Sequence, residues 1–197
     1  MNAPRTVTAN FERPHLTSTQ VGMLAFLASE VAFFSTLIVA YLAFFGKDLD
    51  GPRPSVLSIP LAALGTLCLV SSSVTIHFAE RSLRRDQVST FQGWWSLTIA
   101  LGISFLAITF YEWHGLIYEQ GLTISRNLFG TTYYTLVGFH ALHVTCGVVS
   151  MLIIAVLGMR VHPPAAGVEL VSWYWHFVDV VWIVVFCVVY LASRSAT

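Results

Sequence analysis

Five ionisable side chains lie inside apolar stretches, where they could carry protons, hold a metal or pair with one another across helices. They are Glu30, His140, His143, His176 and Asp179. His140 and His143 are three residues apart, as are His176 and Asp179, so each pair shares one face of a helix. Ionisable groups are expensive in hydrocarbon, which makes each one a candidate functional residue that faces protein and not lipid.

These histidines raise the question of haem or metal ligation. Haem between helices needs paired histidines on facing helices at matched depth. His140 and His143 point the same way, and His176 is expected nearer the inner surface of the membrane. We therefore favour hydrogen bonding between helices, with Glu30 and Asp179 as acceptors, over ligation, and direct proton carriage is the remaining alternative.

The first and fourth apolar stretches place Glu30 and His143 at similar depth. Their depths differ by only a turn or two at ~1.5 Å per residue, which allows a contact between them. Gly147 follows His143 on the same helical stripe, and a glycine there would let a neighbouring helix approach closely.

The elements that carry these residues are long and apolar. Of 197 residues, 56% are hydrophobic and 10% are charged, whereas a soluble domain has roughly a quarter charged. This excludes a soluble globule and a disordered chain. Crossing a bilayer core takes about 20 helical residues, and the stretches that meet this length are 21–45, 56–78, 94–113, 132–157 and 173–192. The predicted fold class is all-α: a polytopic membrane protein with a bundle of five transmembrane helices (21–197) after a polar tail (1–20).

The loop cations indicate an orientation. The cations on the side of the amino terminus are Arg5, Arg13, Arg81, Arg84, Arg85 and Arg160. The opposite side has Lys47, Arg53, Arg126 and Arg194. Because cytoplasmic loops carry the excess of positive charge, we expect the amino terminus inside and residues 1–20 to form a cytoplasmic tail.

A second set of residues falls at the predicted span ends. His77, Glu80 and Arg81 end the second span, and Glu112 and His114 end the third. We interpret them as interfacial groups that close a helix. The tryptophans at span ends are interpreted as headgroup-zone anchors; they are Trp94, Trp95, Trp113, Trp173 and Trp175.

Several classes of site are not indicated. The net charge is zero, so there is no basic face for nucleic acid. Cys68, Cys146 and Cys187 lie in apolar runs and are expected to be small buried hydrophobes. We find no phosphate-binding glycine loop, no cysteine-pair metal signature and no defensible Ser–His–Asp order. No catalytic, cofactor-binding or metal-binding residue is therefore predicted in this chain.

Three motifs together resemble subunit III of haem-copper terminal oxidases, the cytochrome c oxidase subunit 3 family, in its short five-helix bacterial form. They are Ser29-Glu30 ahead of an aromatic-rich helix, GFHALHV at 138–144 and WYWHFVDVVW at 173–182. Their order and spacing follow the family. Ala141 stands where many relatives have glycine, a small-for-small change. Relative to seven-helix members the chain lacks the first two helices, so a lipid cleft must be completed by another subunit or be absent.

The resemblance implies a non-catalytic subunit of a respiratory enzyme in the bacterial inner membrane. Such a subunit supports assembly, stability and sustained proton uptake while the complex reduces oxygen. Partners would be subunit I, which holds the haems and copper, subunit II, and a small subunit IV in some complexes. Structural phospholipid is expected. The five intramembrane polar residues would stabilise the bundle and contribute to the lipid site.

Other functions remain open from the sequence. The same family includes quinol-oxidase subunits and accessory proteins of nitric oxide reductase. A different class would be a membrane haem-binding electron carrier that uses His140, His143 and His176. A proton-coupled transporter fits poorly, because five helices without a repeat do not suit that architecture.

Overall fold

A computed structural model describes residues 16–47, 51–52, 54–160 and 162–192. Within these ranges the chain is helical and has no strand. The long helices are α1 (Ser18–Phe44), α2 (Ile59–Leu83), α3 (Val88–Tyr118), α4 (Leu128–Arg160) and α5 (Ala165–Phe186). A short 3-10 helix (Pro54–Val56) precedes α2, and a π-helix (Cys187–Ala192) continues α5. In the described part of the chain, five helices are long and apolar enough to cross a membrane, which confirms the predicted class.

The helices extend beyond the predicted spans. The third was expected over 94–113 but forms Val88–Tyr118, and the fifth was expected from residue 173 but begins at Ala165. Hydropathy detects only the part of a helix that suits hydrocarbon, whereas the hydrogen-bonded backbone continues through flanking polar residues. Residues assigned to span ends can therefore lie well inside a helix.

Local sequence explains how two of these helices begin. Thr17 forms a capping box with Gln20 at the start of α1: the Gln20 backbone N–H donates to Thr17 Oγ1, and the Thr17 N–H donates to Gln20 Oε1. Gln20 Nε2 also donates to Glu169 Oε1 of α5, at 3.3 Å. In α2, Pro60 occupies the first turn, where its missing N–H costs no hydrogen bond.

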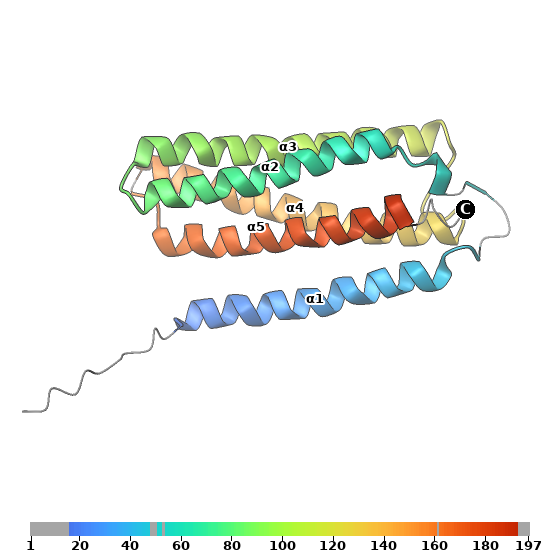
Figure 1. Cartoon of the computed structure of the whole chain (residues 1–197), viewed down its shortest axis with the longest axis horizontal. Coiled ribbons are helices and arrows are strands. Elements are labelled where there is room, and N and C mark those ends of the chain that lie inside the picture. The colour runs from blue at the N-terminus through green and yellow to red at the C-terminus, as the bar shows by residue number, and fades with distance from the viewer. Residues whose placement is uncertain (1–15, 48–50, 53, 161, 193–197) are drawn as a thin grey trace, which may run out of the picture.

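The five helices divide into a packed group and one helix at its side (Figure 1). Helices α2 to α5 pack together, and α1 lies against α4 and α5. The described side chains that α1 buries fully are Phe34 and Tyr41, so most of this helix faces outward. It is the least buried of the five apolar helices.

The close packing of these helices involves an indole ring that lies against two glycines. Trp175 of α5 is fully buried, and its Nε1–H donates to Ser72 Oγ of α2 at 2.8 Å. A Cβ atom at Gly102 would lie 2.8 Å from this ring, and one at Gly147 would lie 2.7 Å from it. Gly147 thus permits the close helix approach expected of it, and α3, α4 and α5 converge on one side chain.

Two interpretations from the sequence are wrong. Trp175 is not an interfacial anchor but a core residue, and Trp95 is likewise buried, with its Nε1–H donating to the Met151 carbonyl at 2.9 Å. Cys146 and Cys187 are exposed and Cys68 is only half-buried. An apolar sequence context does not require burial inside the bundle, because the lipid-facing surface is itself apolar.

The start of α1, the α2–α3 turn and the α4–α5 connection lie at the same end of the bundle (Figure 1). Arg81, Arg84 and Arg85 are exposed at this end. Arg5, Arg13, Arg53 and Arg194 lie outside the described residues, as do residues 1–15 of the expected tail and the side chain of Arg160. The inside position of the amino terminus therefore stays a prediction.

Candidate functional site

The first polar pair joins α1 to α4. His143 Nε2 lies 3.1 Å from Glu30 Oε2, and His143 Nδ1 lies 2.7 Å from the Phe139 carbonyl. A carbonyl only accepts, so Nδ1 must carry a proton. Nε2 and Glu30 therefore share one further proton, either as a carboxylic acid donating to imidazole or as imidazolium beside carboxylate. The depth match expected from the sequence produces a contact that holds one proton between two helices.

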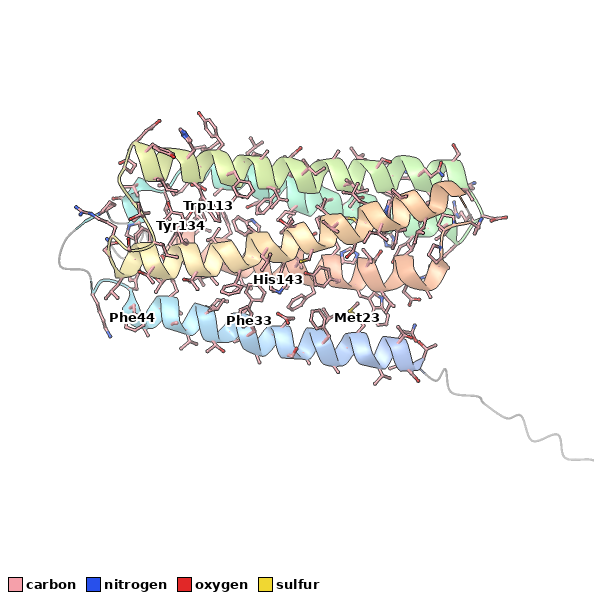
Figure 2. All side chains as sticks on the ribbon, turned by 180° about the vertical axis from the view of Figure 1, so that it is seen from behind. Met23, Phe33, Phe44, Trp113, Tyr134 and His143 are labelled. Carbon is pink, nitrogen blue, oxygen red and sulfur yellow. The ribbon has the colours of Figure 1, made fainter. Side chains whose placement is uncertain are left out.

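This pair lies in an apolar groove. A cavity of about 390 Å³ between α1, α4 and α5 is lined mainly by hydrophobic side chains, with Glu30, His143 and Ser150 among its polar members. Tyr174 Oη, also on its wall, donates to the His143 carbonyl at 3.0 Å. Met23, Phe33 and His143 lie between α1 and the packed group (Figure 2). The groove can accept an apolar chain with a polar group at the depth of Glu30.

His140 has different neighbours from His143, although both lie on one helical face. It is completely buried, stacks on Trp182 with a ring separation of 4.8 Å, and meets the ring of Phe105 edge to face. Neither ring nitrogen has a hydrogen-bond partner among the described residues. The hydrogen bonding expected for His140 is replaced by aromatic packing.

The third group joins α2 to α5. The Ser73 hydroxyl donates to Asp179 Oδ2, and Ser73 Oγ lies 3.1 Å from His176 Nδ1. Because the serine proton is directed to Asp179, its oxygen is free to accept from His176 Nδ1–H. Asp179 thus acts as an acceptor, as expected, with a donor on a neighbouring helix. From the sequence, Ser73 is interpreted only as a helix-packing residue, since a serine in an apolar helix carries little signal alone.

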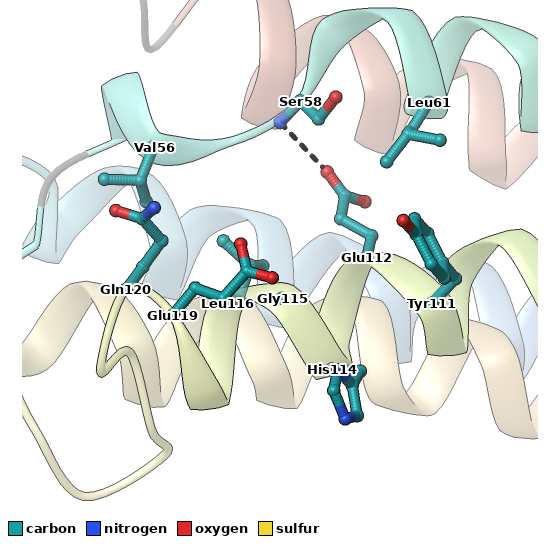
Figure 3. Close-up of a pocket in the computed structure, with 10 residues that line it drawn as sticks. All are labelled: Val56, Ser58, Leu61, Tyr111, Glu112, His114, Gly115, Leu116, Glu119 and Gln120. Atoms are coloured by element: carbon teal, nitrogen blue, oxygen red, sulfur yellow. Dashed lines mark hydrogen bonds between the residues drawn. The ribbon is translucent and has the colours of Figure 1, made fainter.

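Glu112 differs from the interfacial group predicted. It is 6% exposed and lies before the last turn of α3. The Ser58 backbone N–H donates to Glu112 Oε1 at 3.1 Å (Figure 3), and Tyr190 Oη donates to Oε2 at 2.8 Å. Tyr190, on the π-helix, also lies 3.1 Å from Tyr133 Oη. Glu112 therefore caps α2 and connects it to α3, α4 and the π-helix.

A cavity of about 270 Å³ lies beside Glu112 and is lined by Ser58, His114 and Glu119, among others (Figure 3). Glu119 and His114 are exposed, whereas Glu112 is buried, so the ionisable side chains that line this cavity extend from the interior to the surface. The partners of Glu112 are 54 and 78 residues away in the chain, and no local motif could have identified them.

The remaining residues expected at the membrane interface are either exposed or half-buried. His77, Arg81 and His114 are exposed, and Glu80 and Trp173 are half-buried. The other tryptophans assigned to span ends, Trp94 and Trp113, are also half-buried. These side chains lie at or near the ends of the bundle, unlike Trp175 and Glu112.

The residues weighed as haem or metal ligands have separate surroundings. His140 is enclosed by aromatic rings, His143 pairs with Glu30, and His176 contacts Ser73. Among the residues that the structure describes, no three His, Cys, Asp or Glu side chains are grouped as a metal site. At three places, around Glu30, Asp179 and Glu112, polar side chains can hold a proton and join neighbouring helices.

The chain is similar to known proteins over nearly all its length. A family model described as cytochrome c oxidase subunit III matches residues 5–194. A relative named cytochrome c oxidase subunit 3 from Corynebacterium diphtheriae is 36% identical, with 96% of this chain and 94% of the relative covered. Relatives with the same name from Synechocystis and Bacillus subtilis are 40% and 35% identical, covering 86% and 87% of this chain and 74% and 84% of their own lengths.

Proposed function

The chain belongs to the cytochrome c oxidase subunit III family, and we propose that it is the non-catalytic subunit III of a bacterial haem-copper oxidase in the inner membrane. Membership of this family makes it a multi-pass membrane component of a respiratory oxidase complex. Its proposed work is to support assembly, stability and sustained proton uptake while partner subunits reduce oxygen. The observation that carries the proposal is the family match across five apolar helices.

The proposed partners are subunit I, which would hold the haems and copper, subunit II, and a small subunit IV in some complexes. The side of α1 that turns away from the packed group supports a partner contact there. The fully buried side chains of this helix are Phe34 and Tyr41, and its exposed apolar side chains, such as Val31, Val39 and Leu42, need cover from lipid or protein. Subunit I is the proposed neighbour of this face.

Structural phospholipid is proposed for the groove beside α1. The groove has room for part of an acyl chain, and the Glu30–His143 pair supplies a polar group inside it. Another subunit is proposed to cover the open side of this groove. Glu30, His143 and Tyr174 are the residues proposed to set its polarity.

Co-purification tests membership of the complex. A tagged copy of this chain is expected to bring down a larger haem-containing subunit, visible in a reduced-minus-oxidised absorption spectrum. The purified chain alone should give a flat spectrum. A haem signal from the chain alone would support the electron-carrier alternative, and a pull-down without any oxidase subunit would contradict the proposal.

Turnover measurements test the supporting role. Oxidase prepared without this chain is expected to start at a nearly normal rate of oxygen reduction and then to lose activity faster during turnover. Re-addition of the chain should restore the lifetime. A lower initial rate with an unchanged rate of inactivation would argue against the proposed role and would favour a direct part in catalysis.

A further inference from the structure

Two polar stripes face each other along α2 and α5. The α2 stripe has the spacing 4, 3, 4 and consists of Ser73, His77, Glu80 and Arg84. The α5 stripe has the spacing 3, 4, 3 and consists of Glu169, Ser172, His176 and Asp179. These spacings keep each set on one face of its helix. We call the contact between them the α2–α5 seam.

The two stripes lie on neighbouring helices that run in opposite directions (Figure 1). Ser73 contacts both His176 and Asp179. Along the same face of α2, His77 lies about one turn and Glu80 about two turns beyond Ser73, and Glu80 shares a cavity wall with Glu169 of α5. The seam is thus a series of proton donors and acceptors, with Ser73 at its inner junction.

The seam opens at one end. A cavity of about 240 Å³ is lined by Glu80, Arg84 and Glu169, beside the α2–α3 turn. Arg84 is exposed there, and Glu80 and Glu169 are half-buried. Water and protons can therefore reach Glu80 from the surface at this end of the bundle.

The seam is closed at the other end. Asp179 is 4% exposed. The next positions on the two faces are Leu69 on α2 and Trp182 on α5, both buried and apolar. Asp179 Oδ1 has no hydrogen-bond partner in the described part of the chain, so a proton on that carboxyl group avoids a poorly compensated buried charge.

We propose that the α2–α5 seam is a proton relay that connects Asp179 with the aqueous surface beside the α2–α3 turn. A proton from water in the cavity passes by way of Glu80 to His176 Nε2. His176 Nδ1–H then moves to Ser73 Oγ as the Ser73 hydroxyl proton moves to Asp179 Oδ2. Glu80, His176 and Ser73 end with their original proton counts, and Asp179 has gained one proton. Release follows the reverse path, so the seam stores a proton and does not cross the membrane.

Hydrogen–deuterium exchange of Asp179 tests the relay in the assembled oxidase complex. The C=O stretch of protonated Asp179 is identified by infrared difference spectroscopy as the band that Asp179→Asn removes. After transfer to D₂O, the deuterium shift of this band gives the rate of proton exchange. The parent protein is expected to exchange without a long delay.

Two variants interrupt the relay at different atoms. Ser73→Ala removes a single hydroxyl, and His176→Phe keeps a flat ring but removes both nitrogens. We expect each to slow the exchange at Asp179 about a hundredfold or more, within the range lost when a positioned proton-transfer group is removed. Ser73→Thr, which retains a hydroxyl, should restore the rate.

His114→Phe is the matched control, because this exposed histidine lies at the opposite end of the bundle. It should leave exchange at Asp179 unchanged. Exchange at the parent rate in Ser73→Ala or in His176→Phe would overturn the proposal. So would a spectrum in which Asp179→Asn removes no protonated-carboxyl band. Ser73→Ala is the deciding variant if the phenylalanine variant does not assemble.

Discussion

The α1–α4 junction and the α2–α5 seam use the same residue types in opposite ways. Each places an acid and a histidine at membrane depth where two helices meet. At the junction the side chains of Glu30 and His143 are 17% and 15% exposed and border a groove of about 390 Å³. In the seam Asp179 is 4% exposed, and Ser73 connects it to His176. The chemistry of the groups is alike, but their accessibility differs.

Packing produces this difference. Helix α5 is drawn against α3 and α4 because Gly102 and Gly147 make room for the Trp175 indole. Helix α1 lies against α4 and α5 mainly through larger side chains such as Phe33 and Phe34, which meet His143 and Phe139 at ring distances of 4.9 to 6.3 Å. The polar pair beside α1 therefore borders open space, whereas Asp179 is enclosed by packed side chains.

A larger side chain at Gly147, where α4 packs closely against Trp175, should have the largest effect. Gly147→Leu would place Cβ 2.7 Å from Trp175, and overpacking of this kind costs about 1–3 kcal/mol or more. We expect loss of the assembled complex, measured by its yield after solubilisation. Gly93→Leu is the control, because no atom lies within 4 Å of the Cβ position there. Equal yields from both variants would show that the packed group is as adaptable as the junction.

A cation at the loose junction should have the next largest effect. Glu30→Lys puts a charge next to His143, and lysine at a helix centre costs about 3 kcal/mol on insertion scales. We expect reduced assembly and a lower denaturation midpoint. Glu30→Gln should assemble normally, since its amide N–H can donate to His143 Nε2. Normal yield and stability of the lysine variant would contradict the orientation of Glu30 toward α4.

Removal of the Glu112 carboxylate should have a smaller effect. Glu112→Ala leaves the Ser58 N–H and the Tyr190 hydroxyl without their acceptor, at a cost of about 2 kcal/mol. Glu112→Gln should retain most of the stability, because an amide can accept from Ser58 and donate to the Tyr190 oxygen. The denaturation midpoint of the complex is the measurement. An alanine variant as stable as the parent would mean that water replaces the carboxylate from the adjacent cavity.

Loss of a single hydroxyl in the groove should have the smallest effect. Tyr174→Phe removes the hydrogen bond to the His143 carbonyl, worth about 1 kcal/mol. We expect a slightly lower denaturation midpoint and unchanged assembly. Tyr111→Phe is the control, because Tyr111 is exposed on α3. A decrease in the denaturation midpoint as large as that of Glu112→Ala would show that the groove tolerates substitution no better than the packed group.

The helices and the family could be predicted from the sequence because both signals are local. A run of about 20 apolar residues specifies a membrane helix by itself, and the WYWHFVDVVW motif at 173–182 is contiguous. The similar depth of Glu30 and His143 could also be read from the sequence, and it allowed their contact. These features need no knowledge of which helices are neighbours.

The remaining features depend on neighbours. Trp175 and Glu112 both lie near the ends of apolar runs, where interfacial residues are common, yet each is buried by partners on other helices. Ser73 gains its role only from the facing residues His176 and Asp179. A single sequence gives the face of a helix but not the helix that covers it.

The bond between Glu112 and Tyr190 also has a consequence for synthesis of the chain. Tyr190 follows Glu112 by 78 residues, so the ribosome has completed nearly the whole protein before this hydroxyl exists. Until then Glu112 Oε2 must remain hydrated near the bilayer surface, because its burial with only the Ser58 N–H bonded to Oε1 is costly. Arrival of the final helix closes that end of the bundle, and a chain truncated before it would leave an open, hydrated acid that membrane quality control could detect.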